Sequence, residues 1–72
     1  MSEKHFVRQI TIDEQIAEVR REIAMRRKVY PKWIEASSLP KVKADFQILA
    51  MEAVLISLRD VAKKTKPQAG LF

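Results

Sequence analysis

The sequence has no cysteine among its 72 residues. This absence excludes disulfide bonds and thiolate metal sites, which often support chains this short. A single histidine, His5, offers no usual pattern for a zinc site. A chain of this length buries only about 60% of the surface that its unfolded form exposes. We therefore expect a partner subunit to supply the missing stability.

Glycine is almost as scarce as cysteine. The only glycine is Gly70, so no glycine turn interrupts residues 1–69. This continuity favours helices and argues against an all-β fold or a phosphate-binding loop. It also leaves no glycine turn for an oxyanion site, and Ser37, Ser38 and Ser57 have no evident histidine and acid partners. We therefore predict a non-enzymatic protein with no catalytic residues, no cofactor, no metal site and no small-molecule substrate.

Long apolar segments are also missing. The longest apolar-dominated run, residues 46–58, is interrupted by Gln47, Glu52 and Ser57. A membrane-spanning helix needs about 20 mostly apolar residues, so we expect no membrane association. The first residues lack the apolar core of a secretory signal. The sequence therefore predicts a soluble, cytoplasmic protein.

Basic residues outnumber acidic ones, with 14 Lys and Arg against 9 Asp and Glu and a formal net charge of +5. This balance favours acidic partners such as nucleic acid or an acidic protein face. Five cations would share about 140° of one helix at 100° per residue. These candidate nucleic-acid-binding residues are Arg20, Arg21, Arg27, Lys28 and Lys32. Tyr30 and Trp33 could stack on bases beside these cations. The alternative to nucleic-acid binding is that the cations form a solvated face whose long side chains cover the edge of the core.

The first predicted helix begins at a capping box. Thr11 and Glu14 have the spacing at which each side chain bonds the backbone N–H of the other. The apolar residues that follow have the four-three spacing of a heptad seam. They are Ile12, Ile16, Val19, Ile23, Tyr30 and Trp33. The period continues across Pro31, so we predict one helix over residues 12–36, kinked at the proline, rather than a helix that ends near Val29.

Arg26 fills the one polar position of this seam. A buried guanidinium is costly unless it is paired. Arg26 therefore either lies at the edge of the seam or meets Asp45 or Glu52 from the second helix, and we favour the edge. Glu22, four residues earlier, is placed to form a helical ion pair with it.

The second predicted helix covers residues 41–64, after a turn at residues 37–40. Its apolar residues form two seams, each with four-three spacing. One seam is Ala44, Ile48, Met51, Leu55, Leu58 and Ala62. The other is Val42, Phe46, Leu49, Ala53 and Ile56. A helix with two apolar seams needs two partners, and the first helix can cover only one of them.

These patterns predict an all-α fold, an antiparallel helical hairpin that dimerises into a four-helix bundle. In this homodimer the second helix would be central and the first would lie outside. Residues 1–10 would form an N-terminal arm, and residues 65–72 a mobile tail. The predicted protein-interface residues are Phe46, Leu49, Ala53, Ile56, Tyr30 and Trp33.

The segments EQIAEVRREIAMRRKVYPKWI and ADFQILAMEAVLISLR carry a resemblance to known proteins. They are similar to a group of short helical-hairpin proteins of bacterial genomes and prophages, over residues 14–59. The shared features are an arginine-rich RRKVYPKW-type end of the first helix and an MEAVL-type core in the second. The group has no established activity. The resemblance implies a phage or prophage accessory protein, located in the host cytoplasm if it is phage-encoded.

Two functional hypotheses follow from the sequence. The preferred one is a small non-enzymatic interaction protein that binds a host or phage protein. The alternative is a basic dimer that binds DNA or RNA through the cationic face of the first helix.

Overall fold

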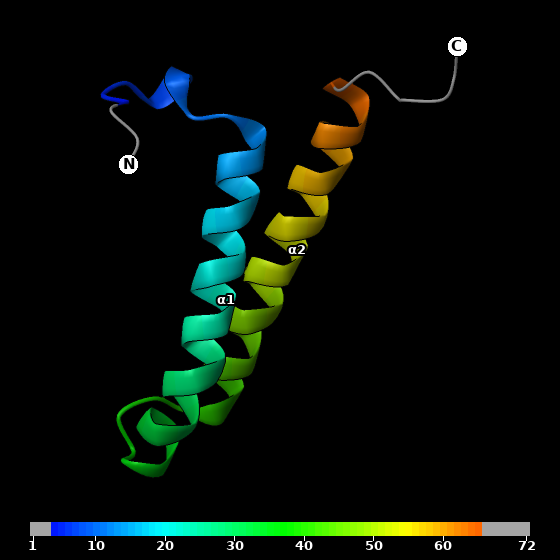
Figure 1. Cartoon of the computed structure of the whole chain (residues 1–72). Helices are drawn as coiled ribbons and strands as arrows, with labels where there is room; N and C mark the ends of the chain where they lie inside the picture. Colours follow the sequence, from blue (N-terminus) through cyan, green and yellow to red (C-terminus); the bar gives the residue numbers. More distant parts are fainter. Residues whose placement is uncertain (1–3, 66–72) are drawn as a thin grey trace.

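The computed structural model describes residues 4–65, and within them the chain is helical. A short 3-10 helix, η1 (Val7–Gln9), precedes two long α-helices, α1 (Ile12–Glu35) and α2 (Lys41–Thr65). The long helices run in opposite directions and pack against each other, and residues 4–65 contain no strand (Figure 1). The predicted all-helical hairpin is therefore confirmed. Apart from Thr65, the predicted tail lies outside the described residues, as do residues 1–3.

The start of α1 is fixed by the predicted capping box. The backbone N–H of Glu14 donates to the Thr11 hydroxyl at 3.1 Å, and the backbone N–H of Thr11 donates to the Glu14 carboxylate at 2.9 Å. Two N–H groups that the helix cannot satisfy by itself are thereby bonded. A cap of this kind contributes about 1 kcal/mol to helix stability.

Pro31 lies inside α1, and the helix continues through it to Glu35. Proline has no backbone N–H, so the carbonyl of Arg27 loses its helical partner at this point. The Pro31 side chain is exposed, whereas Tyr30 before it is buried. The apolar period thus points inward as far as Tyr30, and beyond the proline Ile34 is half-buried.

The turn between α1 and α2 is a Schellman motif built on serine. Ser37 adopts a left-handed conformation with φ of 61°. Its N–H donates to the carbonyl of Ile34 at 3.0 Å, and the N–H of Ser38 donates to the carbonyl of Trp33 at 2.9 Å. These two bonds satisfy carbonyls that the end of α1 leaves free. The backbone therefore reverses direction without glycine, and α2 begins directly after Pro40.

The core lies between the predicted seam of α1 and one seam of α2. The α2 residues that face α1 are all buried or half-buried: Ala44, Ile48, Met51, Leu55, Leu58 and Ala62. In α1 the same holds for Ile12, Ile16, Val19, Ile23 and Tyr30. Trp33 departs from the pattern, because 47% of its surface is exposed. One apolar layer between two helices is therefore the whole core of the described hairpin.

This core is thin for a folded domain. Among the described residues, the apolar side chains that reach the buried class are Ile23, Tyr30, Ala44 and Ala62. The radius of gyration is 16.1 Å, whereas a compact domain of 72 residues would have a value of about 11 Å. The hairpin is elongated and leaves much of its apolar surface outside the core. No helix within residues 4–65 has the length and apolar character needed to span a membrane.

Candidate interaction surfaces

The second seam of α2 forms an exposed apolar face. We call Val42, Phe46, Leu49, Ala53 and Ile56 the outer face of α2. The exposed fractions are 83% for Val42, 68% for Phe46, 63% for Leu49 and 60% for Ile56, and Ala53 is also exposed. Apolar side chains of this size are seldom left in water as a continuous stripe unless they meet a partner.

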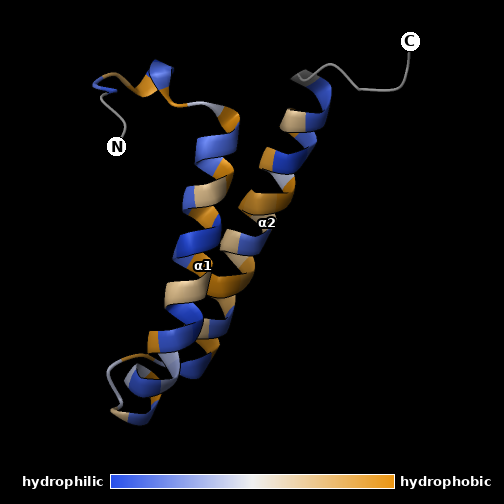
Figure 2. Cartoon of the chain, viewed as in Figure 1, coloured by the Kyte–Doolittle hydropathy of each residue, from blue (hydrophilic) through white to orange (hydrophobic). Residues whose placement is uncertain are grey.

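The outer face of α2 lies opposite the core. At 100° per residue its centre is about 180° around the helix from the seam that contacts α1. Apolar residues recur along the whole of α2, whereas α1 carries long polar stretches (Figure 2). No segment within residues 4–65 folds back over the outer face, since η1 and the turn lie at the ends of the hairpin (Figure 1). The face is accessible within the described part of the chain.

Charged residues border the outer face on one side. Asp45, Glu52 and Arg59 follow one another at intervals of seven along α2. Asp45 pairs with Lys41 at 2.7 Å, and Glu52 pairs with Arg27 of α1. Arg59 is exposed and has no ion pair within residues 4–65. On the other side the border is less charged, with Lys43, Ala50 and Ser57.

Arg26 lies at the edge of the core, as predicted, with 24% of its side chain exposed. Its Nε pairs with Glu22 at 2.8 Å, and its Nη1 donates to the backbone carbonyl of Gln47 at 3.1 Å. The guanidinium carbon also lies 6.0 Å from the centre of the Tyr30 ring. The alternative partners Asp45 and Glu52 bind other cations. Arg26 therefore joins the two helices through a backbone carbonyl rather than through an acid.

Tyr30 and Trp33 take different positions at the turn end of the hairpin. Only 6% of Tyr30 is exposed, and its hydroxyl donates to the Gln47 side chain at 2.9 Å. Trp33 packs beside it, with ring centres 5.5 Å apart and planes inclined by 34°, but its outer surface faces solvent. Of the two predicted aromatic contact residues, Tyr30 is thus part of the core and Trp33 alone is accessible.

The five predicted nucleic-acid-binding cations are exposed on α1, but two of them are already paired. Arg21 pairs with Glu18 at 2.5 Å, and Arg27 pairs with Glu52 across the helix interface. Arg20, Lys28 and Lys32 have no ion pair within residues 4–65. The unpaired positive charge of this surface is therefore smaller than the sequence suggests.

A shallow depression lies between α1 and α2 beside these cations. It is open to solvent, with a volume of about 240 Å³, and its lining residues are Arg20, Ile23, Ala24, Arg27, Glu52 and Leu55. The Glu52 carboxylate neutralises Arg27 within it. Its apolar floor belongs to the core. The depression is a gap at the edge of the helix interface rather than an enclosed ligand site.

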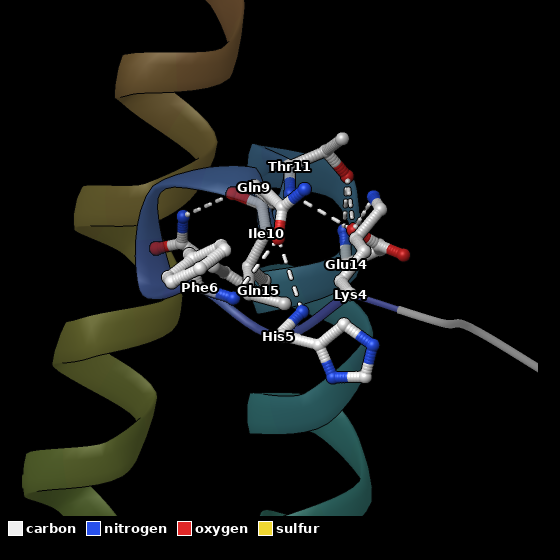
Figure 3. Close-up of polar contacts among 8 residues, drawn as sticks. All are labelled: Lys4, His5, Phe6, Gln9, Ile10, Thr11, Glu14 and Gln15. Atoms are coloured by element: carbon white, nitrogen blue, oxygen red, sulfur yellow. Dashed lines mark hydrogen bonds and ion pairs between the residues drawn. The ribbon is translucent and has the colours of Figure 1, made fainter.

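The N-terminal arm is held on the start of α1 by polar contacts (Figure 3). The Gln9 side-chain oxygen accepts bonds from the backbone N–H groups of His5 at 3.0 Å and Phe6 at 2.9 Å. Lys4 reaches forward to the Glu14 carboxylate at 2.5 Å. Phe6 and its neighbour Val7 are exposed by 71% and 85%. The arm therefore packs through polar rather than apolar groups.

Two carboxylates have a lowered pKa because of these contacts. The Lys4 ammonium, helped by the backbone N–H of Thr11, lowers the pKa of Glu14 below its ordinary value of 4.5. The Arg21 guanidinium lowers the pKa of Glu18 in the same way, and Glu18 raises the pKa of Arg21. Both carboxylates are exposed to solvent in α1. Their shifts mark surface ion pairs and helix caps rather than a reactive site.

Gln47 is a contact residue that sequence reasoning missed. It bonds Tyr30 through its side chain and Arg26 through its carbonyl. The only sign of this role in the sequence is its place beside Ile48, which puts a polar side chain at the edge of the α2 seam that faces α1. Within residues 4–65 no group of three or more acidic or histidine side chains could hold a metal ion.

No protein-family model, curated protein or solved structure matches this chain.

Proposed function

We propose that the chain is a small non-enzymatic interaction protein whose working surface is the outer face of α2. The observation that carries the proposal is the continuous exposure of Val42, Phe46, Leu49, Ala53 and Ile56 on the side of α2 away from α1. An amphipathic helix that presents such a stripe binds proteins by laying it against another helix or into an apolar groove. Its large side chains would supply most of the binding energy.

The nature of the partner forms part of the proposal. The resemblance of residues 14–59 to helical-hairpin proteins of bacterial genomes and prophages supports a phage or prophage accessory factor that binds a host or phage protein in the cytoplasm. The small core supports, on physical grounds, that the chain binds a partner. A chain that buries few apolar side chains by itself gains stability from any partner that binds its folded form.

A basic nucleic-acid-binding protein is the second candidate. It is favoured by the exposed cations Arg20, Lys28 and Lys32, which have no ion pair within residues 4–65. It is disfavoured by the burial of Tyr30, which leaves only Trp33 to stack on a base. If nucleic acid were the partner, affinity would fall steeply with salt, and each lost phosphate contact would reduce the salt slope by about one.

Three single substitutions separate the two functions. Leu49→Glu places a charge in the outer face of α2, and Lys28→Glu reverses a charge in the cationic surface of α1. Met25→Glu is the matched control for Leu49→Glu, because Met25 is an exposed apolar residue of α1, at 48% exposure, and lies outside the outer face of α2. The measurement is affinity capture from the producing cells with each variant as bait.

The proposed function predicts that Leu49→Glu loses the captured protein, whereas Lys28→Glu and Met25→Glu retain it. The opposite result would be that Lys28→Glu loses the captured material, that Leu49→Glu retains it, and that nuclease treatment removes it. The apolar face would then not be the working surface, and the nucleic-acid function would replace the proposal.

A further inference from the structure

The outer face of α2 has the sequence order of a coiled-coil seam. Its residues follow the four-three spacing from Val42 to Ile56, and the next residue in the series is Asp60. In heptad terms Phe46, Ala53 and Asp60 occupy a positions, and Val42, Leu49 and Ile56 occupy d positions. The seam spans about 21 Å from Val42 to Ile56 at 1.5 Å per residue. A second helix with the same spacing would match it along its whole length.

We propose that the occupant of this face is α2 of a second copy of this chain, running antiparallel and centred at the level of Met51. The inference rests on the proposed function, since it assigns an occupant to the same outer face, for which a host or phage protein would then compete. In this register a positions face d positions across the two-fold axis. The layers are Phe46 against Ile56 of the second copy, Leu49 against Ala53, and Val42 against Asp60.

The sizes of the facing side chains support this register. Large Leu49 would meet small Ala53 next to the axis, and this contact occurs twice by symmetry. Alternation of large and small side chains across an interface allows two helices to interdigitate at native density. The two α2 helices can also come close together at the two-fold axis, because small Ala50 would lie there beside Ala50 of the second copy.

The bordering charges support the antiparallel direction. Asp45 and Arg59 lie on the same border of the outer face, and in this register each Asp45 meets Arg59 of the second copy. The remaining border acid, Glu52, meets its own symmetry mate near the axis, but Arg27 of the same chain neutralises it. Border charges of this kind set partner choice and orientation in coiled coils. Two complementary pairs would thus form in each dimer.

The parallel direction is opposed by charged residues near the end of α2. It would place Asp60 against Asp60 inside the seam and Arg59 beside Lys64 on the border. Like charges held together in an interface cost binding energy. In either direction α1 lies on the far side of α2, so the two α1 helices remain outside (Figure 1).

A charge-swap cycle tests the register, with the self-association constant measured by sedimentation equilibrium at low salt. Asp45→Arg and Arg59→Asp each create two like-charge contacts in the antiparallel dimer, and each should weaken association about tenfold or more. The double variant restores both pairs with reversed polarity and should return to within about threefold of the original chain. In a parallel dimer positions 45 and 59 lie about 21 Å apart and their effects would simply add.

Cysteine cross-linking gives a second readout on a chain that has no cysteine of its own. An equimolar mixture of Val42→Cys and Asp60→Cys chains should form a mixed disulfide, whereas Val42→Cys alone should not cross-link. Bridged residues must have Cα atoms within about 7 Å, and the two positions meet this limit only in the antiparallel register.

The outcomes are distinct. Restoration by the double charge swap together with the mixed disulfide supports the inference. A monomer at all concentrations overturns it while leaving the proposed function to the capture experiment. Cross-linking of Val42→Cys with itself overturns the antiparallel register and keeps the outer face as a protein interface.

Discussion

At the scale of single residues, the tightest local constraint is the conformation of Ser37. It is the one non-glycine residue of the described part of the chain with a positive φ. A side chain in this left-handed region crowds the following carbonyl and costs roughly 1 kcal/mol or more, whereas glycine carries no such cost. The two hydrogen bonds of the Schellman motif therefore offset a local strain in the backbone at Ser37.

Replacement of Ser37 by glycine should stabilise the hairpin. We expect Ser37→Gly to raise the free energy of unfolding by about 0.5–1 kcal/mol, because relief of the left-handed strain exceeds the added flexibility of the unfolded chain. Urea denaturation at fixed protein concentration measures the change. Ser38→Gly is the control. It should destabilise, since the Ser38 hydroxyl donates to the Trp33 carbonyl at 3.1 Å. A loss of stability in Ser37→Gly would contradict the strain argument.

The ion pairs of Glu14 and Glu18 predict a dependence of stability on pH. Both carboxylates have a pKa lowered by the fold, from an ordinary value of 4.5. Their contribution is therefore fully present above that value and is lost as the pH falls through the lowered pKa of the folded state. The thermal midpoint should decline over this acid range.

The double substitution Glu14→Gln and Glu18→Gln should flatten that acid decline in circular dichroism melts. Glu35→Gln is the control, because Glu35 is exposed at the end of α1 and has no ion pair within residues 4–65. An unchanged acid decline in the double variant would mean that other carboxylates carry the effect.

At the scale of helices, the spacing of residues along the sequence predicts the main features of α1 and α2. The capping box at Thr11, the continuation of α1 through Pro31 and the two seams of α2 all follow from local spacing, since a helix repeats its faces every 3.6 residues. What spacing cannot supply is the axial offset between α1 and α2. That offset decides that Arg27 meets Glu52 and that Gln47 meets Tyr30. The offset also determines that Tyr30 is buried and that about half of Trp33 is exposed.

The proline inside α1 gives a prediction at this scale. Pro31→Ala should restore the helical bond to the Arg27 carbonyl and raise the free energy of unfolding by about 2 kcal/mol, after allowance for the greater freedom of the unfolded chain. Chemical denaturation measures it. Lys32→Ala, at the exposed neighbouring position, should change stability by less than about 0.5 kcal/mol. A decrease in Pro31→Ala would show that the proline positions the Tyr30 and Trp33 rings.

At the scale of the whole molecule, the hairpin has one apolar layer inside and a second apolar stripe outside. Proteins with so small a core gain stability by binding, and an equilibrium that couples folding to self-association depends on protein concentration. The sequence predicted both stripes from the four-three spacing of apolar residues in α2. It could not show that the described arm would leave the outer stripe uncovered, because that depends on the polar contacts of Gln9 and Lys4.

The thermal midpoint should therefore rise with protein concentration. Each tenfold increase stabilises the associated form by about 1.4 kcal/mol per mole of dimer. Leu49→Glu should lower the midpoint and abolish its concentration dependence, since it places a charge where two apolar faces meet. Met25→Glu, with the same change of side chain on exposed α1 surface, should keep the dependence. A midpoint that is independent of concentration in the original chain would contradict coupled folding.

The opposed apolar faces of α2 have a consequence for tolerance to mutation. One side of α2 packs on α1, the other is the outer face, and between them lie two borders, one charged and one less charged. Few positions of α2 can therefore accept a polar residue, whereas most of the solvent side of α1 can vary freely. A saturation scan of all single substitutions should show two intolerant stripes in α2 but one in α1. Related chains that keep the same partner would then differ in sequence more in α1 than in α2.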